Sequence, residues 1–223
     1  MDQDESLSRR PEAEIIRLDV STQQVYRCQQ VADLHISEIH HGVLPLLGPR
    51  ALARLYGCIA QAPRSGVWLA VEEDRLAGFL AGCFDVKECY RSALMNGGWG
   101  LLSAILGLLA KPRNLPKITS LLTYPFRVNR NPSVMNSRQG LHPELLAIAV
   151  RPECRGQGIG KRLITAFEDS LSRWGFWGRY FVTTNINEAG SNAFYGALGF
   201  EPEVVLPHHD LRLQLYSKRV HSR

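Results

Sequence analysis

Hydrophobic positions along the first third of the chain follow strand and helix periods in turn. Residues 14–20 form a short apolar run that predicts a first strand, and helical spacing follows over 23–39. A second helix is predicted over 49–60, where Pro49 stands at the first helical position and its missing N–H costs little. Segments 67–72 and 76–84 are apolar and rich in strand formers, so with the polar turn at 73–75 they predict a hairpin.

The last third of the chain repeats this alternation. Residues 145–150 are a continuous apolar run, which predicts a buried central strand. A glycine-rich turn follows, and apolar positions from Ile159 to Trp174 then mark one face of a long helix. Three further elements are predicted: a strand over 179–184, a helix over 188–198 that ends before Gly199, and an alternating strand over 211–216.

Residues 85–141 interrupt this order. No charged residue occurs from Ser92 to Ala110, a length near the lower limit for a membrane-spanning helix. Asn96 and the glycines at 97, 98 and 100 break up its first half, so only residues 101–110 are predicted to be firmly helical. We therefore expect a buried or interfacial helix here, followed by a second basic segment around residues 117–122.

The positive charge of the chain is concentrated in this interruption. The formal net charge is +5, and residues 85–139 hold eight basic residues against Asp85 and Glu88, which leaves the rest of the chain near neutral. Such a local excess indicates a local anionic partner. The eight basic residues are Lys87, Arg91, Lys111, Arg113, Lys117, Arg127, Arg130 and Arg138.

Length and composition predict one α/β domain. The 223 residues, with 45% hydrophobic and 21% charged, are typical of a globular protein. We expect a single domain over 14–223, with 85–141 as a helical, basic and apolar insertion. Residues 1–13 are polar and lack the apolar core of a signal peptide, so we expect a disordered tail and a cytoplasmic protein.

Cysteine and histidine usage argues against a disulfide scaffold and a metal centre. The five cysteines are odd in number, scattered, and form no CxxC pair, so free buried thiols are expected. The neighbouring histidines at 40–41 and 208–209 would point apart on a helix or strand, and no carboxylate cluster accompanies them. We expect no metal.

The glycine turn at residues 155–160 is the strongest candidate for ligand binding. Glycines let the backbone approach a ligand, and a helix start offers unpaired N–H groups with partial positive charge, which together suit a phosphate. A dinucleotide GxGxxG fails because position 161 is Lys161, and a P-loop fails because Arg155 and Arg162 stand at two of its required positions. A tight turn without a ligand is the structural alternative.

Two neighbouring motifs narrow this choice. Residues 146–153 leading into Arg155-xx-Gly158-x-Gly160 resemble motif A of the GNAT superfamily of acyl-CoA N-acyltransferases. Asn192-Ala193-Phe194-Tyr195 followed by Leu198-Gly199-Phe200 resembles motif B of that family. The two occur in the right order, separated by one helix and one strand, over roughly the last third of the chain. The resemblance implies an α/β fold with a mixed, largely antiparallel sheet, splayed central strands and flanking helices.

The resemblance also implies a cofactor, acetyl-CoA, and residues that hold it. Main-chain groups of Ile148, Ala149 and Val150 would pair with the pantetheine arm, although these residues also serve the core. Asn187 and Asn192 are cofactor candidates, and the choice among them and Asn185 stays open. The pyrophosphate would lie on the turn residues Arg155, Gly156, Gln157, Gly158, Ile159, Gly160 and Lys161.

The implied chemistry is direct attack of an amine on the thioester in a ternary complex. Tyr195 matches the family tyrosine that protonates the departing thiolate, with an aromatic packed beneath CoA as the alternative. Glu144 is the candidate base, His142 is the second choice, and a structural Glu144 is weighed equally. A backbone N–H near Ala149 or Val150 would polarise the acetyl oxygen. No covalent intermediate is needed, so Cys154 is incidental.

The basic insertion suggests the chemical class of the acceptor. We expect a primary amine on a small molecule such as an amino sugar or sugar nucleotide, whose phosphates the basic segment would hold. A protein N-terminus or lysine acceptor, and a CoA-binding module without catalysis, are the alternatives; without an aromatic-basic motif, nucleic acid is not expected as a partner. The insertion at 85–141 is expected to form a basic, apolar lid or, through 92–123, a peripheral membrane contact that selects the acceptor. A dimer contact or extra core is the alternative, ranked slightly ahead of the membrane contact.

Overall fold

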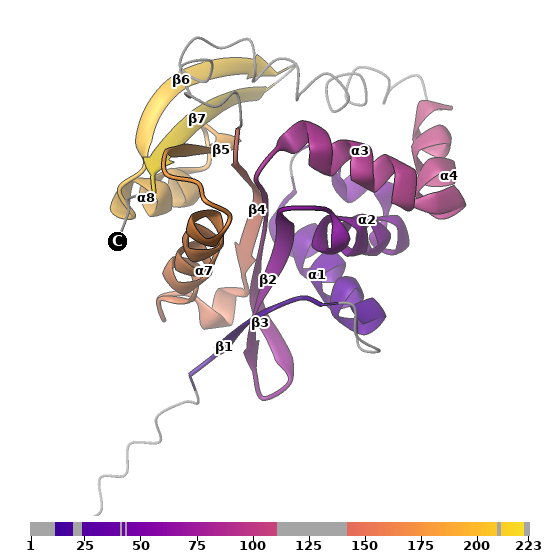
Figure 1. Ribbon diagram of the computed structural model, residues 1–223, viewed down its shortest axis with the longest axis horizontal. Helices are drawn as coiled ribbons and strands as arrows, with labels where there is room; N and C mark the ends of the chain where they lie inside the picture. Colours follow the sequence, from indigo (N-terminus) through magenta and orange to yellow (C-terminus); the bar gives the residue numbers. More distant parts are fainter. Residues whose placement is uncertain are drawn as a thin grey trace, which may run out of the picture.

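The computed structural model describes residues 12–19, 24–40, 42, 44–110, 142–208 and 211–220. The predicted basic segment around 117–122, most of the predicted tail at 1–13, and His41 and His209 lie outside these residues. The described chain forms a seven-stranded sheet with helices on both faces (Figure 1). The predicted α/β fold class is therefore confirmed.

The first half builds one edge of the sheet and the helices that cover one face. Its two-residue hairpin turn places both Glu73 and Asp74 at positive φ (46° and 64°), the backbone that a twisted hairpin favours. The first strand ends three residues earlier than predicted. The elements are β1 (Glu14–Arg17), α1 (Gln24–Glu38), the 3₁₀ turn η1 (Leu44–Leu47), α2 (Pro49–Gln61), β2 (Ser65–Glu72) and β3 (Arg75–Cys83).

The described part of the insertion forms two helices where one was predicted. Helix α3 (Val86–Asn96) begins at Asp85, whose carboxylate accepts from the backbone N–H groups of Lys87 and Glu88, and this cap offsets the weak helical pattern of the segment. Helix α4 (Gly98–Leu109) follows after a 104° bend at a positive-φ glycine. No single described helix is long and apolar enough to cross a bilayer, whereas this bent pair meets the length and composition test together.

The second half contains every element predicted from its pattern and one that was missed. Strand β6 was not predicted because Pro202 and Pro207 argue against a central strand; it lies at the edge of the sheet, where a missing N–H is tolerated. The elements are β4 (Glu144–Val150), the 3₁₀ turn η3 (Pro152–Cys154), α7 (Ile159–Arg173), β5 (Arg179–Asn185), α8 (Ala189–Ala197), β6 (Glu201–His208) and β7 (Leu211–Arg219).

The strand order β1-β2-β3-β4-β5-β7-β6 places one parallel pair in an otherwise antiparallel sheet. That pair is β4 with β5, and it is joined only at Glu144↔Phe181 and Leu145↔Val182. The remaining residues of both strands have no partner across this line, because the strands diverge. The predicted splay of the central strands is therefore confirmed.

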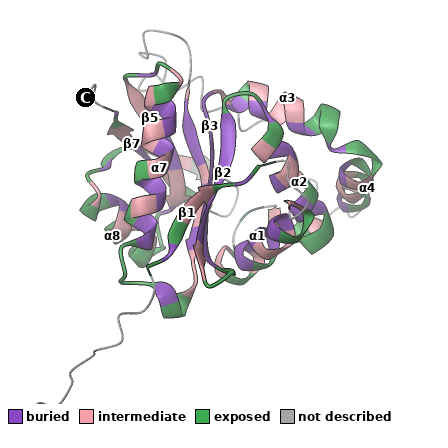
Figure 2. Cartoon of the chain, turned by 60° about the horizontal axis from the view of Figure 1, so that its bottom comes forward, coloured by how far each residue is buried: buried purple, intermediate pink, exposed green. Residues whose placement is uncertain are grey.

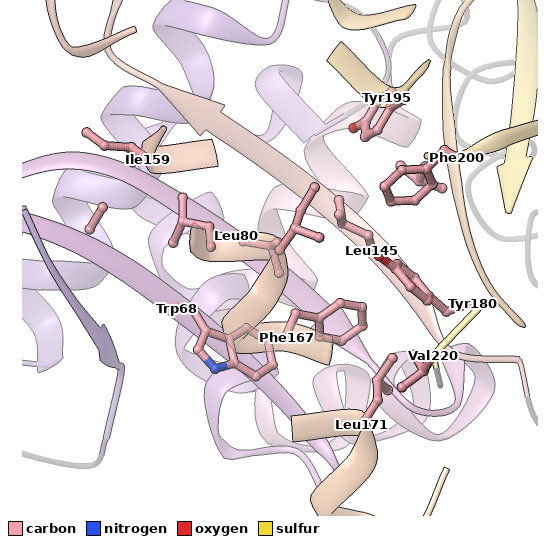
Figure 3. Close-up of a cluster of buried hydrophobic side chains, with 14 of the residues drawn as sticks. Trp68, Leu80, Leu145, Ile159, Phe167, Leu171, Tyr180, Tyr195, Phe200 and Val220 are labelled. Atoms are coloured by element: carbon pink, nitrogen blue, oxygen red, sulfur yellow. The ribbon is translucent and has the colours of Figure 1, made fainter. Parts of the chain in front are cut away.

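Two apolar cores cover the two faces of the sheet. One packs α7 against the sheet through Phe167, Leu171 and their neighbours (Figure 3), and the other holds the buried sides of α1 and α2. Strands β2 and β3 are buried along most of their length (Figure 2). On β4 the side chains alternate, with Ile148 and Val150 on the α7 side and Ala147 and Ala149 on the other. The strand that borders the splay is thus fixed from both faces.

Candidate active site

The glycine turn has the backbone that the sequence predicts at two of its three glycines. Gly156 and Gly158 lie at φ 78° and 76°, where a side chain would be strained, and a Cβ on either would meet only open space. Gly158 is the N-cap of α7 and makes no side-chain cap. The turn therefore leaves the start of α7 uncovered.

The N–H groups of this turn are available to a ligand. Among the described residues, none of the backbone N–H groups from 156 to 161 donates to a backbone carbonyl, and the first that does is Arg162, 3.1 Å from the Gly158 oxygen. Unpaired N–H groups at a helix start carry a partial positive charge. A row of such donors on an exposed turn is suited to a phosphate or another anion.

The Arg155 side chain turns away from the row of free amides. Its Nη2 is paired with the Glu38 carboxylate at the end of α1, and its Nε donates to the Val150 carbonyl at 3.1 Å. The side chain thus joins α1, the end of β4 and the turn. Glu38 was not predicted, because nothing in its local pattern indicates a partner 117 residues away.

Gly160 acts by packing rather than by positive φ, which corrects the expectation for this glycine. A Cβ on it would lie 2.8 Å from the Phe194 ring of α8, a contact that side chains do not make. Only glycine lets α7 and α8 approach this closely. The contact places α8, and with it Tyr195, beside the turn.

Of the three β4 residues predicted to offer main-chain contacts, only two have peptide groups that face the splay, because these groups alternate in direction along a strand. The Arg151 N–H donates to the Ala77 carbonyl on β3 at 2.8 Å, and β4 pairs in regular register with β3 from Ala147 to Val150. Peptide groups two residues apart face the same side, so those of Ala149 point to β3. Those of Ile148 and Val150 point into the splay, where the Val150 carbonyl already accepts from Arg155.

Tyr195 lies in a ring of aromatics between α8 and β7. Its ring centroid is 5.3 Å from Phe194, 5.2 Å from Phe200 and 5.8 Å from Tyr216, and Figure 3 shows it beside Phe200. Gly199, at φ 79°, ends α8 and lets the Phe200 N–H bond back to the Tyr195 carbonyl. Burial raises the pKa of the phenol above its ordinary value near 10, at which tyrosine is already protonated at neutral pH.

The three asparagines at the end of β5 and after it have different roles. The Asn192 amide donates to the Asn185, Ile186 and Glu188 carbonyls at 3.0, 3.2 and 2.8 Å, and its oxygen accepts from the Tyr216 hydroxyl at 2.9 Å. Its polar groups are thus spent inside the chain, which makes Asn192 a support of the loop. Asn185 is buried and accepts from the Asn187 N–H, whereas the Asn187 side chain is exposed.

The opposite end of β4 is closed and built from side chains. Glu144 is only 4% exposed and lies opposite Cys83 in the register with β3. Cys89 and Tyr90 of α3 are close enough to interact with its carboxylate: burial foremost, and then Glu144, raise the pKa of Tyr90. Burial also raises the pKa of Cys83 well above its usual value. Glu144 was predicted as a site residue, but these three neighbours were not, because only the fold brings them close to it.

The remaining predicted residues differ in how far they are buried. His142 is half-buried, and burial, as the main cause, lowers its pKa. All five cysteines are buried, as predicted, and burial raises the pKa of Cys154. Gln157 and Lys161 are exposed, and Ile159 is buried beneath the turn. In the described ranges, no three His, Cys, Asp or Glu side chains gather as metal ligands would.

Comparisons with known proteins agree with this arrangement. The family model described as "Acetyltransferase (GNAT) family" matches residues 35–200. A relative from Arabidopsis thaliana named "Probable N-acetyltransferase HLS1-like" is 43% identical over 56 residues, which are 25% of this chain and 14% of that protein. The chain thus spans a small part of that relative's length.

Two solved structures share the fold over nearly their whole length. The structure of SsHAT aligns with a TM-score of 0.66 at 16% identity, covering 95% of this chain and 100% of that one. The structure of yncA from Salmonella typhimurium with its cofactor acetyl-CoA aligns with a TM-score of 0.56 at 14% identity, covering 95% and 96%. Since the family model covers well over half of the chain, this protein belongs to the GNAT family of acetyltransferases.

Proposed function

We propose that this protein transfers an acetyl group from acetyl-CoA to a primary amine. One observation carries the proposal: the parting of β4 from β5 lies beside a turn whose backbone N–H groups are unpaired among the described residues. A free strand edge suits the amide-bearing pantetheine arm, and the helix start suits the pyrophosphate. The structure of yncA, which has the same fold, contains its cofactor acetyl-CoA.

The residues that would hold acetyl-CoA follow from the geometry. The N–H groups from Gly156 to Lys161 would bind the pyrophosphate, and the splay-facing groups of Ile148 and Val150 would pair with the arm. Acetyl-CoA supplies an acyl group activated as a thioester. Of the two N–H groups predicted to polarise the acetyl oxygen, that of Val150 faces the splay, whereas that of Ala149 points to β3.

Two side chains would move protons. Tyr195 is protonated at neutral pH, as a phenol with a pKa of 10 or above must be, so it has a proton to donate to a departing thiolate. Glu144 would take a proton from the ammonium of the acceptor through water, because only the neutral amine has the lone pair that attacks the thioester. Glu144 begins the strand that borders the splay, but a strand rises about 3.3 Å per residue, so it lies roughly 20 Å from Val150 and would receive the proton only through a chain of waters.

The proposed acceptor is a small amine that carries phosphate, such as an amino sugar nucleotide. Support comes from the local excess of basic residues in the insertion, of which Lys87 and Arg91 are described and exposed. Phosphate groups are the anions that such a cluster recognises. A protein N-terminus or lysine is the second candidate, and an acceptor cleft lined by acidic side chains would favour it.

Calorimetry with acetyl-CoA, followed by a thiol-release screen, tests the proposal. The screen offers amino sugars, sugar nucleotides, polyamines and peptides with free N-termini. We expect micromolar binding of acetyl-CoA and amine-dependent release of CoA with at least one phosphorylated amine. Absence of acetyl-CoA binding would end the acyltransfer proposal. Binding without release for any amine would instead support a CoA-binding module.

A further inference from the structure

The corner formed by α3 and α4 exposes more large apolar side chains than any function proposed above requires. Trp99 is 84% exposed and Met95 76% exposed. Leu94, Leu102 and Leu106 are exposed beside them, and an open hollow of about 240 Å³ lies between the two helices. Exposing such a contiguous group to water is unfavourable, which indicates that something covers it.

Helix α4 buries few of its apolar side chains against the rest of the fold. Only Leu101 and Leu108 among its residues are buried, and no residue from Gly98 to Leu109 carries a charge. The corner lies on the opposite side of the molecule from α7 and α8 (Figures 1 and 2). Whatever covers it would therefore leave the glycine turn open to its ligand.

Basic side chains surround this apolar corner. Arg50 and Arg54 of α2 and Lys87 and Arg91 of α3 are all exposed. The Arg54 guanidinium lies against Gly100, where a Cβ would be 2.8 Å from it, which places this charge directly beside α4. Against these four, α3 and its cap carry two acidic residues, Asp85 and Glu88, and Glu88 pairs with a further basic residue, Arg64, at 3.4 Å. The surroundings of the corner are thus positive.

This combination distinguishes a membrane from a second copy of the chain. A two-fold dimer would bring the same patch of both copies together, and with it Arg54 against the basic residues of the partner copy. Like charges at an interface oppose association. An anionic bilayer instead offers an apolar layer for Trp99 and its neighbours and phosphates for the basic residues around them.

We propose that the α3–α4 corner docks on the surface of an anionic lipid bilayer. Trp99, Met95 and Leu106 enter the boundary between head groups and acyl chains, where tryptophan is favoured. Lys87, Arg91 and Arg54 lie at the level of the head groups. The bent pair lies in the surface, because neither helix is long enough to cross the bilayer. Binding to the bilayer does not depend on whether the protein transfers acetyl groups, although Lys87 and Arg91 are also the described basic residues proposed to hold the phosphates of an acceptor.

Sedimentation with sucrose-loaded vesicles of phosphatidylcholine and phosphatidylglycerol tests the proposal on the full chain. We expect the triple variant Met95→Glu, Trp99→Glu, Leu106→Glu to partition roughly 100-fold less than wild type. The double variant Lys87→Gln, Arg91→Gln should lose about 5-fold per removed charge on these vesicles and little on pure phosphatidylcholine. The substituted apolar side chains are exposed, so thermal unfolding should show that the fold is retained.

Trp177→Glu is the matched control, since Trp177 is 52% exposed in the loop between α7 and β5, away from the corner. It should bind vesicles like wild type. Wild type that fails to sediment with anionic vesicles, or a triple variant that sediments equally well, would overturn the proposal. A wild-type dimer that becomes a monomer in the triple variant, with neither form on vesicles, would overturn it in favour of self-association.

Discussion

The two ends of strand β4 differ in the chemical groups they present and in the parts of the chain that form them. At its carboxyl end the strand leads through η3 into an open turn, where Gly156 and Gly158 hold positive φ and main-chain N–H groups face solvent. At its amino end the strand begins with Glu144, 4% exposed among Cys83, Cys89 and Tyr90. One end offers backbone to a ligand, and the other encloses a carboxylate with side chains.

This difference decides which parts of a site can be predicted from a sequence. A site made of backbone must be built from glycines and a helix start, which are local and visible in a sequence. A site made of side chains needs partners from other elements, because Cys83 ends β3 and Tyr90 belongs to α3. The following predictions test whether the two ends are as separate in function as they are in construction.

The largest expected effect is at the closed end. Glu144→Gln keeps the shape of the side chain but removes the base, so kcat/KM with an amine should fall by about 10²- to 10⁴-fold. Affinity for acetyl-CoA, which depends on the open end, should change less than about twofold. Steady-state thiol release and calorimetry measure the two quantities separately.

Glu153→Gln is the control for this change, because Glu153 is exposed in η3 at the other end of the same strand. It should leave both quantities near wild type. If Glu144→Gln keeps its rate within about twofold, the carboxylate is structural, and the closed end has no part in proton transfer.

The second effect belongs to the open end. Gly158→Glu places a carboxylate and a strained φ at the N-cap of α7, where the pyrophosphate would lie, so acetyl-CoA affinity should fall roughly 100-fold or more. Calorimetry of the purified variant measures this loss. The amide row, rather than any side chain of the turn, is the object of this test.

Gly175 provides a matched position at the other end of α7, with φ 80° and open space around its Cβ site. Gly175→Glu should cost a similar 1–2 kcal/mol of stability through strain alone, with acetyl-CoA affinity unchanged. Equal loss of affinity in both variants would mean that the turn acts through stability and does not bind the diphosphate.

Much of the fold could be predicted because the periods of its elements are strong. The long helix at Ile159–Arg173, the buried strand at Glu144–Val150 and the hairpin of β2 and β3 all follow from apolar spacing. Strand β6 could not, since its two prolines are tolerated only at an edge, and edges are decided by topology. For α4 the sequence left open whether the helix is buried or interfacial, because apolar spacing alone does not say which side chains the fold covers.

The site divides in the same way. The positive φ of Gly156 and Gly158 was predicted, and the different role of Gly160 was not, because its constraint is a ring 34 residues further along the chain. Asn192 carries the motif but spends its amide on three carbonyls of its own loop. A motif identifies the residues that a family needs, whereas contacts decide whether they bind a ligand or support the loop that does.

The third prediction concerns His35, a buried titratable side chain on a helix that covers the sheet. His35 on α1 is 2% exposed, its Nδ1 lies 2.6 Å from the Tyr56 hydroxyl, and burial lowers its pKa to about 4. A lowered pKa in the folded state stabilises the fold above the unfolded value near 6.5, and this contribution is lost as pH falls toward 4. Stability should therefore drop by about 2 kcal/mol between pH 7 and 5 from this group.

Urea unfolding of wild type and His35→Leu at both pH values measures this contribution. The variant should be less stable at pH 7, because Tyr56 loses its partner, and should lose less stability on acidification. His40→Gln, at an exposed position beyond α1, should retain the wild-type pH dependence. An unchanged pH slope in His35→Leu would show that His35 is not the group responsible.

The smallest effect tests how the open end is tied to Tyr195. Gly160→Ala puts a methyl group 2.8 Å from the Phe194 ring, so α7 and α8 must separate slightly, at a cost of roughly 1 kcal/mol. Gly196→Ala adds the same methyl to α8 in open space and should stabilise by about 0.5 kcal/mol, since alanine is the better helix former. Thermal unfolding gives both signs. Because Phe194 is the neighbour of Tyr195, a separation that also lowers turnover in Gly160→Ala, but not in Gly196→Ala, would show that the backbone site sets the position of the side-chain acid.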